Sequence, residues 1–104
     1  MTEGLPGNVG PNRLHRPLAE IAGVIIDDCE WHFHRVPPEA EPYLRTMLGL
    51  ATTDLNAPHG HERVADVVRG ALDNLQGWRT DRAWWIRREL ETALAAADRS
   101  HGAA

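Results

Sequence analysis

Apolar side chains recur at helical spacing in four segments of the chain, and no segment alternates apolar and polar residues as a half-buried strand does. The first segment predicts a helix over 17–33, because the fixed backbone angle of Pro17 suits a first helical position. Pro37 and Pro38 follow the predicted end of this helix. Its expected buried stripe comprises Leu18, Ile21, Ala22, Ile25 and Cys29, and extends toward Phe33.

Two further helices are predicted over 39–48 and 61–76, and the loop between them, 49–60, is rich in turn-forming residues. In the shorter helix the residues expected to face inward are Ala40, Tyr43, Leu44, Met47 and Leu48. In the longer one they are Val64, Val67, Val68, Ala71, Leu72 and Leu75. Gly77 is well placed to end the longer helix as a left-handed stop.

The last predicted helix begins after Thr80, a residue type that caps helix starts well. Its core stripe is expected to comprise Ala83, Ile86, Leu90, Ala93, Leu94 and Ala97. Because the predicted connection to the preceding helix is short, the two C-terminal helices should pack as antiparallel neighbours. The chain is therefore expected to be an all-α, compact four-helix domain over 17–98, with a flexible leader over 1–16 and a frayed tail over 99–104.

Composition supports one domain, since 104 residues with 42% apolar content can bury a modest core. The single cysteine, Cys29, excludes an internal disulfide, and no signal-like or membrane-spanning apolar run is present, which predicts a cytoplasmic protein. All 11 basic residues are arginine, a usage typical of a GC-rich genome and here interpreted as actinobacterial. The net charge of -4 argues against broad, charge-driven coating of DNA.

A tryptophan- and arginine-rich segment opens the last helix. Its members, the predicted partner-binding residues, are Trp78, Arg79, Arg82, Trp84, Trp85, Arg87 and Arg88. The segment carries a local charge of +3, which leaves -7 for the rest of the chain because the total is -4. A basic aromatic patch on an acidic body favours docking onto a protein partner, a host protein or a second copy in a homodimer.

Two alternatives use the same segment. It could bind nucleic acid, because bases stack on aromatic rings and arginines track phosphates. It could also be structural, with the tryptophans closing a thin helical core and the arginines stacked over them or paired with Glu91. Trp84 and Trp85 point about 100° apart on a helix, so at least one of these rings should be partly exposed.

Histidines and the cysteine form a weak set of zinc ligands: Cys29, His32, His59 and His61. The spacing is poor, because His32 and His34 point about 200° apart on a continuous helix. Surface histidines at a helix end explain the same pattern. A small zinc-binding helical domain therefore stays an alternative, and no cofactor is expected.

The acidic run Asp27, Asp28 and Glu30 lies beside these histidines, where a carboxylate and an imidazole could exchange protons. No nucleophile motif or glycine-rich phosphate loop accompanies the run, so we expect no enzyme activity and a solvated acidic face. Cys29 lies on the apolar stripe and is interpreted as a buried small hydrophobe.

Several short motifs resemble a known family. Pro42 to Met47 follows the pattern P-Y-L-x-x-M, and Trp78 to Ala83 follows W-R-x-x-x-A. With Asn74 to Gly77 and Arg87 to Leu90, these runs look like a family of small all-helical proteins from actinobacteria and their phages or integrated elements, for which no activity is assigned. The likeness covers roughly 17–95.

The chain departs from that family pattern by placing Trp85 and Ile86 before Arg87, and by its histidine pairs. The resemblance implies a helical fold and a phage or mobile-element setting, and it carries over no catalytic residue. Together these features predict a small non-enzymatic interaction module.

Overall fold

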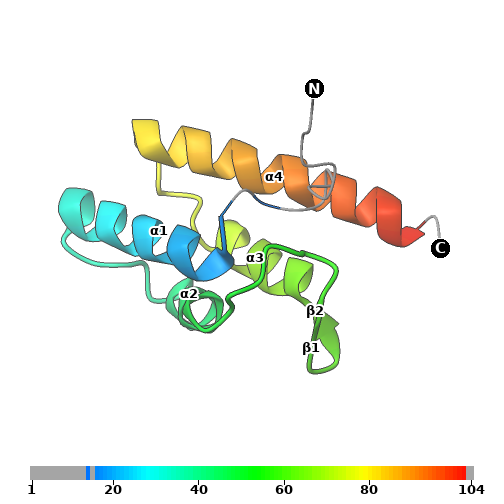
Figure 1. Ribbon diagram of the computed structural model, residues 1–104. Helices are drawn as coiled ribbons and strands as arrows, with labels where there is room; N and C mark the ends of the chain where they lie inside the picture. The colour runs from blue at the N-terminus through cyan, green and yellow to red at the C-terminus, as the bar shows by residue number, and fades with distance from the viewer. Residues whose placement is uncertain (1–13, 15, 103–104) are drawn as a thin grey trace.

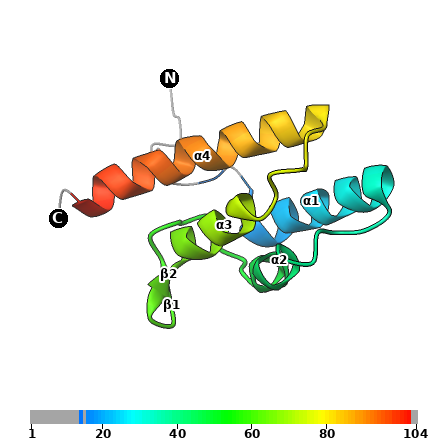
Figure 2. The ribbon, with the colours of Figure 1, turned by 180° about the vertical axis from the view of Figure 1, so that it is seen from behind.

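The computed structural model describes Leu14 and residues 16–102, and within them the chain forms four helices and one very short hairpin (Figures 1 and 2). The elements in chain order are α1 (Leu18–Phe33), α2 (Glu41–Leu48), β1 (Pro58–His59), β2 (Glu62–Arg63), α3 (Val64–Asp73) and α4 (Asp81–Gly102). The predicted compact four-helix domain is confirmed, while the hairpin is an addition that the sequence pattern did not show.

Helices α1 and α3 form the middle of the molecule, with α4 lying across one side and α2 on the other (Figures 1 and 2). α4 runs antiparallel to α3, as predicted, and also to α1. Both views look nearly down the axis of α2, so this helix crosses α1 and α3 steeply. The end of α1 and the start of α4 therefore lie at the same end of the molecule.

Helix α1 has the predicted buried stripe, since Leu18, Ile21, Ala22, Ile25 and Cys29 are all fully buried. Phe33 lies outside the stripe and is 44% exposed. The helix ends before His34, whose N–H still donates to the Glu30 carbonyl and whose left-handed backbone (φ 66°) interrupts the helical conformation. Of the predicted flexible leader, 1–13 and residue 15 lie outside the described residues, whereas Leu14 is buried and donates its N–H to the Thr53 carbonyl.

In α2 the prediction is right for Ala40, Leu44 and Met47, which are fully buried, and wrong for Tyr43 and Leu48, which are 37% and 45% exposed. A helix of eight residues presents only one side to α1 and α3, and these two side chains lie beyond it.

Gly70 explains the position of Tyr43. A Cβ atom at position 70 would overlap the Tyr43 ring, so the bare backbone of α3 makes room for this ring at the edge of the core. Gly70 lowers the intrinsic stability of helix α3, but it also provides the space in which the Tyr43 ring packs.

The third helix is shorter than predicted at both ends. Residues 58–63 form the hairpin around Gly60, whose φ of +64° is a conformation that glycine adopts easily, so α3 starts only at Val64. At the other end α3 stops at Asp73, and the Asn74 side chain donates to the Gly70 carbonyl at 2.8 Å. The prediction of a left-handed stop at Gly77 is wrong, because α3 has already ended and Gly60 is the described glycine with positive φ.

Helix α4 starts as predicted, with the Ala83 N–H donating to Thr80 Oγ1 at 3.0 Å. All six residues of the predicted core stripe of α4 are buried. The helix continues beyond Asp98 to Gly102, past the predicted start of the tail. Among the helices of the described chain, none combines the length and apolarity needed to cross a membrane.

Candidate interaction surface

Asp28 of α1 holds the loop that leads into α4. This carboxylate is only 8% exposed, and its Oδ2 accepts hydrogen bonds from Trp78 Nε1 at 2.8 Å and from the Thr80 hydroxyl at 2.5 Å. Since Thr80 Oγ1 also caps α4, one buried carboxylate fixes both the loop and the helix start. The expectation that Asp28 is solvated is therefore wrong, because its position at the edge of the apolar stripe turns it toward this loop.

The charges around Asp28 favour its ionised form. Burial opposes ionisation and is the largest single influence, but the hydrogen bonds from Thr80 and Trp78 and the nearby charges together outweigh it, so the pKa of Asp28 lies below its ordinary value of 3.8. His32 Nδ1, 3.3 Å from Oδ1, and Arg82 Nε, 3.9 Å from Oδ1, lower the pKa further. Asp28 is thus an ionised acceptor in a structural role.

Two members of the predicted partner-binding set, Trp78 and Arg87, are engaged in contacts within the fold. Trp78 is 1% exposed, and its indole N–H is already used by Asp28. Arg87 is half-buried, donates to the Leu75 carbonyl, and places its guanidinium carbon 6.0 Å from the centroid of the Trp78 ring. These contacts agree with the structural alternative for Trp78 and Arg87, since both residues close the core at the start of α4.

Trp84 and Trp85 are both on the surface, 54% and 67% exposed, which confirms that at least one ring is exposed. With about 100° per residue, they lie roughly 130° to either side of the centre of the buried stripe of α4. Their rings touch edge to face with centroids 4.7 Å apart. Arg88 lies over Trp84, its guanidinium carbon 5.3 Å from the ring centroid. The pair therefore forms an aromatic ridge on α4.

Trp31 belongs to the same end of the molecule and was missed from the sequence. It is 81% exposed, the most exposed large apolar side chain in the described chain. A signal for its exposure is present in the sequence, because Trp31 lies on the side of α1 opposite the buried stripe.

A groove of about 850 Å³ runs between the end of α1 and the start of α4 and brings Trp31 and Trp85 together. Val24 and Ile86 supply apolar lining between the two rings. The charged side chains along the groove are Arg16, Asp27, Asp28, Asp81 and Arg82. The groove is thus lined by both apolar and charged side chains.

A second hollow of about 470 Å³ lies on the other flank of α4, beside Trp84. Arg79 is exposed there and donates from Nε to the Gln76 carbonyl at 3.2 Å. Arg87 also reaches this hollow, although its guanidinium group is held at a backbone carbonyl. We call Trp31, Trp84 and Trp85 with the exposed Arg79, Arg82 and Arg88 the tryptophan surface.

The weak zinc ligands do not converge in the structure. Cys29 is fully buried, and burial, with the charges of Asp28 and Glu30, raises the pKa of its thiol to about 11. His32 is engaged with Asp28 on α1, whereas His59 and His61 belong to the hairpin next to α3. No group of three metal-ligating side chains forms within the part of the chain that the structure describes.

Comparison with known proteins does not extend these observations. No family model, curated protein or solved structure matches the chain. The resemblance to the actinobacterial and phage family, its mobile-element setting and the non-enzymatic role therefore stay predictions.

Proposed function

We propose that this chain is a protein-interaction module that docks a protein partner on the tryptophan surface. One observation carries the proposal: three tryptophans at one end of the fold, Trp31, Trp84 and Trp85, are each more than half exposed. Large apolar rings gathered on a surface typically mark an interaction site. Tryptophan and arginine are also the residue types that contribute most to binding energy at protein interfaces.

The charges favour a protein partner over nucleic acid. Arg79 and Arg88 would attract phosphates as well as carboxylates, but Asp27 and Asp81 line the groove on the Trp85 side. A phosphate backbone following this surface would meet these carboxylates and be repelled. A protein partner can instead present opposite charges to each flank, together with an apolar side chain for the groove.

The partner is sought by affinity capture from an actinobacterial lysate, with and without nuclease. A captured protein is then purified and titrated against the wild type and against Trp84→Ala and Trp85→Ala. We expect each variant to weaken binding about 30-fold, the effect of removing an interface residue worth roughly 2 kcal/mol. Leu48→Ala is the matched control, because Leu48 is similarly exposed but lies on α2.

Two outcomes would contradict the proposal. Equal binding by the wild type and both tryptophan variants would place the contact elsewhere. Nuclease-sensitive capture with an affinity that falls steeply with salt would instead identify nucleic acid as the ligand. Circular dichroism of each variant confirms that the helices remain.

A further inference from the structure

The two flanks of the aromatic ridge, Trp84 and Trp85, differ in the charges that are left without an ion-pair partner in the described chain. In the groove on the Trp85 side, both arginines are close to carboxylates: Arg16 pairs with Glu89 at 2.9 Å, and Arg82 Nε lies 3.9 Å from Asp28. Asp27 makes no ion pair with any described residue, and Asp81 makes none either. The charge that this groove offers to a partner is therefore negative.

The Trp84 side offers the opposite charge. Arg79 donates to a backbone carbonyl, and Arg88 stacks on Trp84 at 5.3 Å. Within the described chain neither arginine is paired with a carboxylate, not even Glu91 one turn away from Arg88. This flank therefore presents an aromatic ring covered by a guanidinium group, together with a second cation.

The chain thus carries both an acidic groove with apolar lining and, on the other flank of the ridge, the Trp84 ring with its arginines, which would fill that groove. Trp84 of the ridge touches Trp85 at the groove edge, with centroids 4.7 Å apart, so the complementary halves are adjacent. A two-fold axis beside this contact places the groove of each copy against the Trp84 side of the other copy. The same contact then forms twice, once on each side of the axis, and the assembly is complete with two subunits.

We propose that the tryptophan surface binds a second copy of this chain. Trp84 of each protomer enters the groove between Trp31 and Trp85 of its partner, and Arg88 faces Asp27 across the interface on both sides of the axis. The proposal rests on the proposed function and names the partner. It also explains why rings of this size remain exposed in the single chain.

Sedimentation velocity of the full chain, from about 1 µM to about 1 mM, tests the proposal. We expect a concentration-dependent dimer. Asp27→Arg and Arg88→Asp should each weaken dimerisation at least about tenfold, because each brings like charges together twice. The variant carrying both changes should recover dimerisation, because the charges are then exchanged rather than lost.

Asp73→Arg is the matched control, since Asp73 is an exposed carboxylate at the end of α3 and lines neither the groove nor the hollow beside Trp84. It should dimerise like the wild type. If a charge reversal lowers the helical content, the milder Asp27→Asn or Arg88→Gln is used in its place. Each of these variants should also weaken dimerisation.

A monomer at every concentration would overturn the second copy as partner. The interaction module would survive that result if a different protein still binds and loses affinity on Trp85→Ala. A dimer that is indifferent to the Asp27 and Arg88 variants, or one that the double exchange does not restore, would also overturn the proposed pairing.

Discussion

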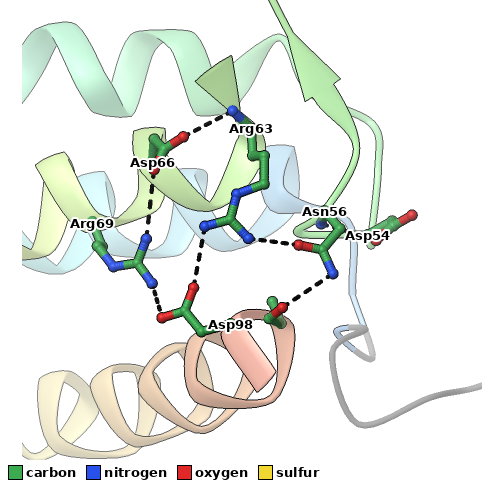
Figure 3. Close-up of polar contacts among 7 residues, drawn as sticks. Asp54, Asn56, Arg63, Asp66, Arg69 and Asp98 are labelled. Atoms are coloured by element: carbon green, nitrogen blue, oxygen red, sulfur yellow. Dashed lines mark hydrogen bonds and ion pairs between the residues drawn. The ribbon is translucent and has the colours of Figure 1, made fainter. Parts of the chain in front are cut away.

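The two ends of α4 are attached to the rest of the molecule by carboxylates in very different surroundings. At the start of α4, buried Asp28 of α1 accepts hydrogen bonds from Trp78 and Thr80. Near the other end of α4, Asp98 accepts hydrogen bonds from Arg63 of β2 and Arg69 of α3 (Figure 3). The Asp98 side chain is 48% exposed, against 7% for that of Asp28.

The Asp98 end has further polar links, which are only partly buried. Arg63 also donates to the Asn56 side chain at 2.7 Å, and Asn56 donates to the Ala97 carbonyl at 3.3 Å (Figure 3). Arg69 lies 3.5 Å from Asp66 of its own helix. Exposed ion pairs of this kind contribute little, because both charges are nearly as well solvated when apart.

We expect burial, rather than the number of polar contacts, to decide which end contributes more to stability. Without Asp28, the buried indole N–H of Trp78 would lose its acceptor inside the protein, and the half-buried Thr80 hydroxyl would lose the same acceptor. Without Asp98, the arginines would turn to water. The buried end also holds the tryptophan surface in place, since Trp78 and Thr80 determine where α4 begins.

The largest expected effect comes from Trp78→Ala. Removing a ring that is 1% exposed should lower the free energy of unfolding by roughly 3–5 kcal/mol, measured by urea denaturation. Trp84→Ala is the control, and its loss should be about 1 kcal/mol or less because that ring is on the surface. Equal losses would show that burial does not separate the two tryptophans.

Asp28→Ala comes next. It should lower the free energy of unfolding by about 3 kcal/mol, because the buried indole N–H of Trp78 and the half-buried Thr80 hydroxyl lose their acceptor. Asp27→Ala, at the neighbouring exposed position, should change stability by less than about 0.5 kcal/mol. A small loss for Asp28→Ala would mean that the loop before α4 is held by packing alone.

The stability contribution of Asp28 should also depend on pH. The pKa of folded Asp28 lies below 3.8, so as the pH falls the unfolded chain takes up this proton first, and the contribution of Asp28 is lost below pH 3.8. The stability difference between the wild type and Asp28→Asn should stay constant well above pH 3.8 and shrink below it, when unfolding is followed from about pH 5 to about pH 2. A difference that grows in acid would reverse the assigned direction.

Asp98→Ala should have the smallest effect of the four. The hydrogen bonds from Arg69 and Arg63 lower the pKa of Asp98, yet this exposed network is screened by salt. We expect a loss well below that of Asp28→Ala, which shrinks further in high salt. If Asp98→Ala destabilised the protein as much as Asp28→Ala, the exposed network would be an essential part of the fold.

Helical period alone predicted most of the secondary structure. The stripes through Leu18 and Cys29 and through Ala83 and Ala97 are buried as expected, because each helix shows one continuous apolar face. The ends of α3 were less predictable. The hairpin at Gly60 and the Asn74 contact depend on local hydrogen bonds that leave no apolar period.

The candidate site was only partly predictable. Sequence spacing required one exposed ring among Trp84 and Trp85, since adjacent helical positions diverge. It could not separate Trp78 from them, because the burial of Trp78 depends on Asp28, fifty residues earlier in the chain. Nor could it pair Trp31 with Trp85, since the groove exists only once α1 and α4 lie side by side.

The sequence by itself determined the four helices, the faces that they bury and the arginine-rich start of α4, because these depend on neighbours within one or two helical turns. Only the tertiary structure decided which tryptophans are structural and which are exposed, and that Asp28 is an anchor rather than a solvated charge. The reason is that burial and hydrogen bonding of these side chains are set by contacts between helices far apart in the chain.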